Sequence, residues 1–101
     1  MASRLDLQKK LETLMGSRNV YFMPPSGLQL KTPAIVYSIK KRDGEYANNK
    51  IYTNKTAYEL IFIDRNPDNP LISEISELPY CEGGRPYTKD GNYHEPFTIY
   101  F

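Results

Sequence analysis

The residues best equipped for catalysis in this 101-residue chain are its only cysteine, Cys81, and its only histidine, His94. A cysteine beside a histidine can act as a nucleophile and general-base pair, because the imidazole can take the proton of the thiol. The residues around Cys81 match no nucleophile motif, and Gly83, Gly84 and the stretch 90–92 indicate loops. We therefore expect a half-buried cysteine and a solvated loop histidine, and no enzyme active site.

A second candidate for chemistry is a metal site, because oxygen-bearing side chains alternate at Asp64, Asn66 and Asp68 as they do where a calcium loop begins. Pro67 interrupts the pattern, and Asn69 stands where such a loop needs glycine. The same residue types are frequent in turns. The sequence therefore favours a polar turn in front of a helix, and we expect neither a metal nor a cofactor.

A third candidate is a basic segment with tyrosines among its charges, which could meet phosphate, nucleic-acid bases or an acidic protein surface. Charge runs of this kind are often only solvated, because exposed charges contribute little on their own. The segment is therefore a candidate contact region. The contact residues that we expect in it are Lys40, Lys41, Arg42, Glu45, Tyr46, Lys50, Tyr52 and Lys55.

The overall composition narrows the class of partner. Thirteen Lys and Arg against twelve Asp and Glu give a net charge of +1, whereas a dedicated nucleic-acid binder is usually strongly basic. A lone cysteine forms no internal disulfide, which is typical of a reducing cytoplasm. No apolar run approaches the roughly 18 residues of a membrane span, and no signal-peptide core is seen. We expect a soluble protein without a membrane partner.

The elements that must position these residues begin with a helix over residues 3–15, in which Leu7, Leu11, Leu14 and Met15 recur on one face. Gly16 suits the left-handed residue that follows a helix end. A short edge strand is expected over residues 19–23, since the two prolines that follow would stop it.

Two strands form the centre of the expected sheet, over residues 34–39 and 56–64. The second has Tyr58, Leu60 and Phe62 on one face and apolar residues including Ile61 and Ile63 on the other, which is typical of a central strand. If the two strands pair as an antiparallel ladder, the polar residues between them form a long hairpin arm.

The rest of the chain predicts a turn-rich loop over residues 65–70 and a short helix with apolar residues at 71, 72, 75 and 78, ended by Pro79. An irregular strand over residues 80–88, a tight turn at Asp90 and Gly91, and a final strand over residues 97–101 complete the chain. The sum is a single α+β domain over residues 1–101. Its mostly antiparallel sheet of four to five strands carries an N-terminal amphipathic helix and a short second helix on one face.

A chain of this size buries only about two thirds of its unfolded surface on folding. A sheet that is apolar on both faces, with only two modest helices to cover it, leaves apolar surface for another chain to bury. The sequence therefore favours a structural or binding role in an assembly of copies.

This order of elements resembles that of the tail terminator and tail-to-head joining proteins of tailed phages. The likeness is strongest over residues 18–25, 33–37, 57–70 and 78–81. The resemblance implies a ring, expected to be a hexamer, that caps the tail tube and docks to the head-side connector or closure protein. DNA would pass through the lumen without specific binding, and the protein would be found in the virion neck after assembly in the host cytoplasm.

Three alternatives stay open at this point. A head-closure or minor capsid protein would occupy an adjacent ring of the same neck. A host-directed regulator would bind one protein through the arm as a monomer. A single-stranded nucleic-acid binder would use Tyr46, Tyr52 and the basic residues, and its binding would depend on salt.

Overall fold

The computed structural model describes residues 4–25, 30–41 and 56–101. In these residues the elements follow one another as α1 (Arg4–Met15), β1 (Val20–Phe22), β2 (Ala34–Lys41), β3 (Ala57–Asp64), α2 (Leu71–Ser76), β4 (Cys81–Gly83), β5 (Tyr87–Lys89) and β6 (Asn92–Tyr100). The α+β class is therefore confirmed. The expected hairpin arm lies outside the described residues, apart from Lys40 and Lys41 at its start.

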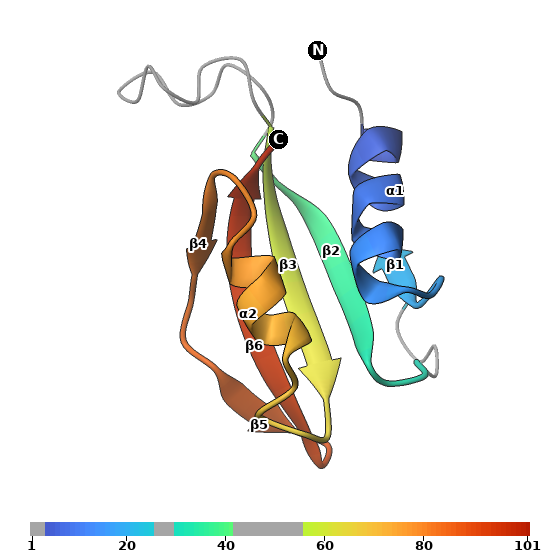
Figure 1. Cartoon of the computed structure of the whole chain (residues 1–101), viewed down its shortest axis with the longest axis vertical. Helices are drawn as coiled ribbons and strands as arrows, with labels where there is room; N and C mark the ends of the chain where they lie inside the picture. The colour runs from blue at the N-terminus through green and yellow to red at the C-terminus, as the bar shows by residue number, and fades with distance from the viewer. Residues whose placement is uncertain (1–3, 26–29, 42–55) are drawn as a thin grey trace.

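The strands form one sheet in the order β1-β2-β3-β6-β4, with β5 pairing to β6. The β1–β2 pair is parallel, and the other pairs are antiparallel. Figure 1 shows β1 and β4 at opposite margins of this sheet. Six strands are one more than the upper expected number, because the irregular stretch 80–88 forms two short strands with a break between them.

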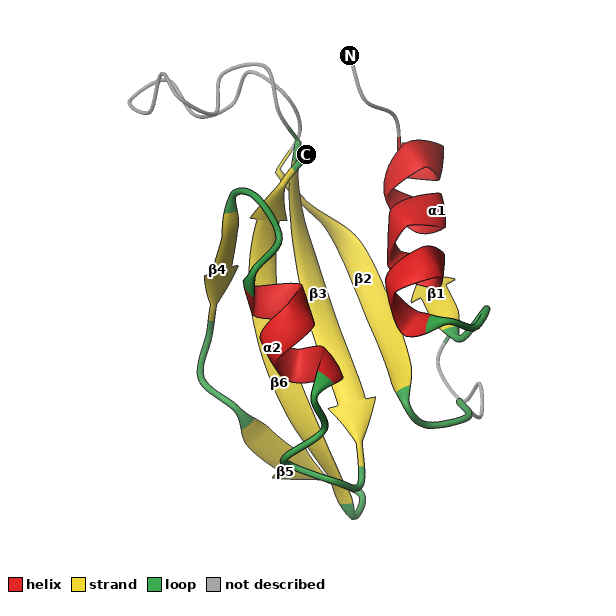
Figure 2. Ribbon diagram, in the orientation of Figure 1, coloured by secondary structure: helices red, strands yellow, loops and turns green. Residues whose placement is uncertain are grey.

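Both helices cover the same face of the sheet, as expected (Figure 2). Helix α1 lies against β1 and α2 against β4, and the helices also contact each other. Beneath them the core side chains of the central strands are almost fully buried, among them Tyr37, Leu60, Phe62 and Ile99. No helix in the described ranges is long and apolar enough to cross a membrane.

Helix α1 begins and ends close to its predicted bounds. Leu7 and Leu11 of the apolar stripe are fully buried, and Leu14 and Met15 pack against the same core. Gly16 has a φ of +68°, and its amide donates to the Glu12 carbonyl at 2.9 Å, so the helix ends in a left-handed residue.

A polar network fixes α1 to the sheet. The Arg4 guanidinium donates to the Tyr37 hydroxyl at 3.1 Å, and this hydroxyl donates to the Gln8 amide oxygen. The Gln8 amide nitrogen donates in turn to the Val20 carbonyl of the edge strand β1 at 3.0 Å. One tyrosine and one glutamine therefore set where the helix lies relative to β1 and β2.

Strand β6 begins at Asn92, five residues before the strand predicted over residues 97–101. The predicted start was wrong because β6 continues through Pro96, and a strand tolerates a proline where its nitrogen needs no ladder hydrogen bond. The Pro96 carbonyl accepts from the Gly84 amide at 2.8 Å, on the side of the break between β4 and β5. Since the N and O of one strand residue point the same way, the missing N–H of Pro96 faces this break and costs no bond to β3. The expected tight turn is confirmed, with φ of +53° at Asp90 and +78° at Gly91.

Candidate interaction surfaces

The face of the sheet opposite the helices carries an apolar row that crosses four strands. Tyr21 pairs with Val36, Val36 with Ile61, and Ile61 with Pro96. These four side chains are partly exposed, and no helix of the described residues lies on this face. We call this row the open-face patch. The sequence had placed Ile61 on it, but the contribution of Tyr21 and Pro96 depends on pairings that only the fold reveals.

A polar row runs beside the open-face patch. It consists of Ser38, Glu59, Thr98 and Glu82, which pair in that order across β2, β3, β6 and β4. Glu59 and Glu82 are exposed. The open face therefore combines an apolar stripe with an acidic border, which is the composition of an interface more than of a solvated surface.

His94 borders the other side of the patch. It is 9% exposed and lies in β6, with its ring stacked on Tyr87 at 4.9 Å between centroids. Its Nδ1 lies 3.2 Å from the Asn92 carbonyl. The expectation of a solvated loop histidine was wrong, because β6 continues through this position as an ordinary ladder strand.

The fold keeps Cys81 and His94 apart. Cys81 pairs with Ile99, five residues along β6 from His94, which at the rise of a strand is about 17 Å. An odd separation also places the two side chains on opposite faces of the sheet. Burial, with a smaller effect of the Glu82 carboxylate, raises the pKa of the Cys81 thiol from 9.0 to about 11. At neutral pH this thiol is therefore protonated, and His94 lies too far away to act as its base.

The polar loop before α2 uses its oxygens within the chain. Asp64 accepts from the Arg65 amide at 2.9 Å and from the Asn69 side chain at 2.8 Å. Asn66 accepts from the Asp68 amide at 3.0 Å. The Asn69 oxygen accepts from the Leu71 amide at 2.9 Å, at the start of α2. The predicted polar turn in front of a helix is confirmed, and these oxygens accept hydrogen bonds within the turn and at its junction with α2.

A cleft of about 570 Å³ lies where the loop before β2 approaches the turn between β5 and β6. Leu30 and Thr32 line one side, and Asn92 and His94 line the other. The Asn92 amide oxygen is buried there and has no hydrogen-bond partner among the described residues. No group of three metal-ligating side chains accompanies it in this part of the chain.

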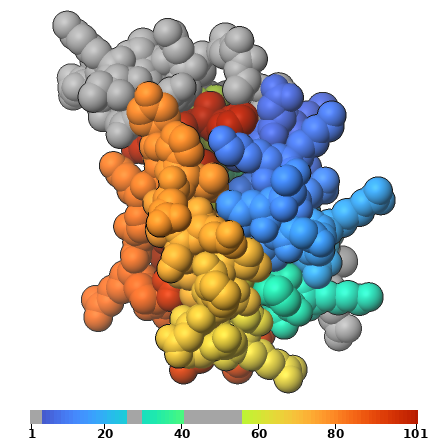
Figure 3. Space-filling view, viewed as in Figure 1, coloured from blue at the N-terminus to red at the C-terminus, as the bar shows by residue number. Residues whose placement is uncertain are grey.

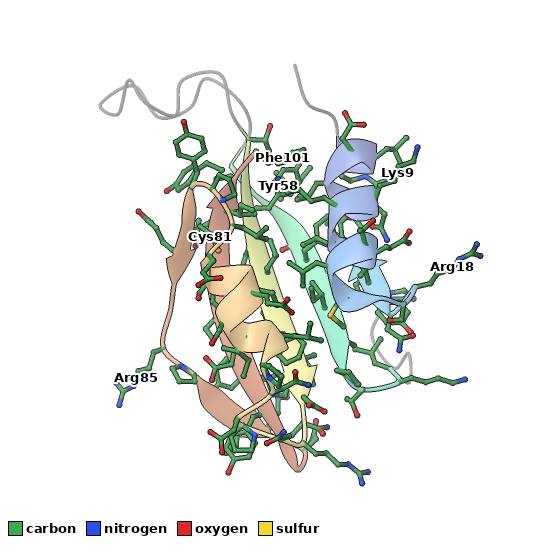
Figure 4. The ribbon with its side chains drawn as sticks, in the orientation of Figure 1. Lys9, Arg18, Tyr58, Cys81, Arg85 and Phe101 are labelled. Atoms are coloured by element: carbon green, nitrogen blue, oxygen red, sulfur yellow. The ribbon has the colours of Figure 1, made fainter. Side chains whose placement is uncertain are left out.

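A basic groove runs along the outer side of α1 and the turn that follows it. It has a volume of about 380 Å³ and is lined by Lys9, Glu12, Thr13, Ser17 and Arg18. Figure 4 shows Lys9 and Arg18 projecting outward on this side of the molecule. The sequence places Lys9 off the apolar stripe of the helix. Arg18 joins it only because the turn at Gly16 brings Arg18 back beside the helix.

The opposite margin of the molecule is acidic. Residues 66–84 contain no Lys or Arg, and their acidic residues, all exposed, are Asp68, Glu74, Glu77 and Glu82. Glu74 lies in α2, Glu77 is the C-cap residue of α2, and Glu82 lies in β4. We call these three residues the acidic edge. In Figure 3, α1 and the segment from α2 to β4 occupy opposite sides of the visible face.

Of the eight contact residues expected from the sequence, only the first two fall within the described part of the chain. Lys40 is exposed near the end of β2. The remaining six, from Arg42 to Lys55, lie outside the described residues. Comparison of the chain with known protein families, with curated proteins and with solved structures finds no match.

Proposed function

We propose that this chain is a structural subunit of a ring at the head–tail junction of a tailed phage, where it caps the tail tube and joins it to the head. The open-face patch carries the proposal. Among the described residues it is an apolar surface on a sheet whose other face is already covered by the helices, and such a surface suits burial against another chain.

The energetic argument for a multi-chain assembly is simple. Burying the remaining exposed part of a side chain such as Val36 or Ile61 contributes roughly 1 kcal/mol. Each subunit of a closed ring has the same four partly exposed side chains, so the free energy gained by burying them is repeated at every subunit. Contact between subunits is thus a way for a small domain to bury the part of a sheet that its own helices leave exposed.

The electrostatics also suit a ring through which DNA passes. A net charge of +1 gives no strong general attraction to phosphate, so DNA can slide through a lumen without being gripped. The resemblance of the element order to tail terminator and joining proteins supplies the place in the particle. The proposed partners are sister copies, the tail tube protein and the head-side connector.

Localisation in intact particles tests the proposal. Gold-labelled antibody against the chain, or a reconstruction of the particle, should place it between head and tail. Phage that cannot make the chain should yield separate heads and tails. Label on the capsid surface or the tail tip, or joined particles without the chain, would contradict the proposal.

The same preparation separates the neighbouring alternatives. When joining is blocked downstream, a tail terminator stays with the free tails and a head-closure protein with the free heads. A regulator directed at the host would be absent from purified particles and would copurify with a host protein. Each reading thus predicts a different fraction for the chain.

A further inference from the structure

The basic groove of α1 has more positive charge than negative charge among the described residues that line it. It holds the cations of Lys9 and Arg18 and one carboxylate, that of Glu12. The Glu12 carboxylate already accepts from the Gln8 amide at 3.0 Å. The Thr13 hydroxyl likewise already donates to the Lys9 carbonyl at 2.9 Å. The groove therefore presents mainly its two cations to whatever lies beside the helix, and such cations are suited to carboxylates.

The acidic edge lies at the other margin of the same sheet. The strand order places β1, against which α1 packs, at one end and β4, against which α2 packs, at the other. Glu74 and Glu77 belong to α2 or its C-terminal cap, and Glu82 to β4. Residues 66–84 contain no Lys or Arg, and the acidic edge ends at Arg85, which follows β4 and projects from the same margin (Figure 4).

We infer that the acidic edge of one copy docks beside the basic groove of the next, so that the subunits join head to tail. This inference rests on the proposed ring and assigns its subunit contact. Two like edges would repel each other, whereas unlike edges attract, and the sign of the charge therefore selects the arrangement. A contact between unlike surfaces of identical subunits is the kind that closes into a ring, whereas a contact between like surfaces gives only a pair.

A second copy of this chain fits the groove better than a nucleic acid does. The complementary surface exists on every copy, at the margin that a cyclic arrangement brings next to the groove. The chain's balance of charge gives nucleic acid little general attraction, and the carboxylate of Glu12 inside the groove opposes phosphate. Phosphate binding is the competing outcome of the test.

Two double charge reversals test the contact. K9E/R18E makes the groove acidic, and E74K/E82K makes the edge basic. Each variant alone should lose ring formation, with association about a hundredfold weaker or more, because like charges then face each other. An equimolar mixture should form rings that contain both variants, since every contact in an alternating ring again joins opposite charges. Sedimentation and native mass spectrometry measure the assemblies.

A matched control reverses charge away from both surfaces. R65E/K89E changes the net charge as much as K9E/R18E does, at exposed positions beyond the groove and the acidic edge, and should assemble like the wild type. Circular dichroism and thermal unfolding verify that all three variants fold. Should the wild-type protein assemble only on particles, incorporation of the same variants into particles is the readout.

The outcomes separate this inference from the proposed function. Rings formed equally well by the wild type and both reversals would overturn the head-to-tail contact and leave the ring standing. Failure of the mixture to restore assembly would also overturn it. Loss of phosphate or DNA binding in K9E/R18E, with rings intact, would assign the groove to nucleic acid. A wild-type chain found in no ring, in solution or in particles, would instead remove the proposed function.

Discussion

At the scale of single residues, the hydroxyl of Tyr37 is the best-defined polar contact in the core. It accepts from Arg4 and donates to Gln8, which holds the carbonyl of Val20. Replacing Tyr37 by phenylalanine should cost about 1–2 kcal/mol, because Arg4 and Gln8 then lose a shared partner in a partly buried site. Urea unfolding of the Tyr37→Phe variant measures this loss.

Tyr21 provides the control for this prediction. It lies on the open face, partly exposed, and removing its hydroxyl by Tyr21→Phe leaves the network of Tyr37 intact. Stability should change by less than about 0.5 kcal/mol. An equal loss in both variants would mean that the network contributes nothing specific to the position of α1.

The thiol of Cys81 predicts a loss of stability at alkaline pH. Burial raises its pKa to about 11 in the folded chain from 9.0, with a further contribution from Glu82. Below pH 9 the thiol is protonated in both states, so its contribution is complete there. As the pH rises towards 11 the unfolded thiol ionises first and favours unfolding, by roughly 2 kcal/mol at most.

Unfolding curves across this pH range measure the effect of Cys81. Replacing Cys81 by alanine should flatten the alkaline decline, whatever its effect on stability at neutral pH. Burial also raises the pKa of Tyr37, so part of the decline should persist in the variant. An unchanged slope would assign the whole decline to groups other than the cysteine.

At the scale of elements, the sequence predicts best where the apolar period is long. Leu7, Leu11 and Leu14 recur over two helical turns, and Tyr58, Leu60 and Phe62 alternate along a full strand, so α1 and β3 were both correctly predicted. Each pattern repeats often enough that chance and tertiary context cannot easily overrule it.

Prediction fails where pairing decides the structure. Nothing local in Val20–Phe22 states that β1 runs parallel to β2, because parallel and antiparallel partners accept the same residues. The early start of β6 depends on the side to which the backbone of Pro96 faces. Pro96 is tolerated because it faces the break between β4 and β5, where its missing N–H costs no hydrogen bond. The prediction of a solvated loop at His94 was wrong for the same reason, because the residues around it do not indicate the strand in which it is buried.

The end of α1 gives a prediction at this scale. Gly16 has a φ of +68°, where a side chain is strained, so Gly16→Ala should cost about 1–2 kcal/mol. Gly83 in β4 is the matched control, because its φ lies outside the positive range and a Cβ there meets no atom within 4 Å. Thermal unfolding should show Gly83→Ala close to the wild type, and equal losses would contradict the role of the left-handed residue.

At the scale of the whole molecule, the sequence indicated that apolar surface would be left over but did not show where. Ile61 and Ile63 pointed to a second apolar face, and the fold divides them: Ile63 is 9% exposed beside the cleft, whereas Ile61 remains partly exposed in the open-face patch. The basic groove was missed because Arg18 follows the end of the helix, and only the turn at Gly16 brings it beside Lys9. The net charge of the whole chain hides such a separation of sign, because thirteen positive and twelve negative residues nearly cancel in the total.

The open-face patch gives the prediction that bears most directly on assembly. Ile61→Lys places a charge in the middle of the row, at a position exposed enough for the chain to fold with the ammonium in water. In the assembled particle the same charge would be taken out of water within an apolar row, at a cost of roughly 3 kcal/mol or more. The variant should therefore unfold much like the wild type but be lost from particles, as measured by quantitative immunoblotting of purified virions.

Ser38→Lys is the matched control, because it adds the same charge to the same face. Ser38 pairs with Glu59 in the polar row, so a lysine there finds a carboxylate opposite it and lies away from the acidic edge. It should fold and enter particles. Exclusion of both variants would mean that the whole face tolerates no added charge, and normal incorporation of Ile61→Lys would show that the patch faces solvent in the particle. If Ile61→Lys is excluded and the control is not, assembly depends on the apolar row itself, because both variants place the same residue and charge on the same face of the sheet.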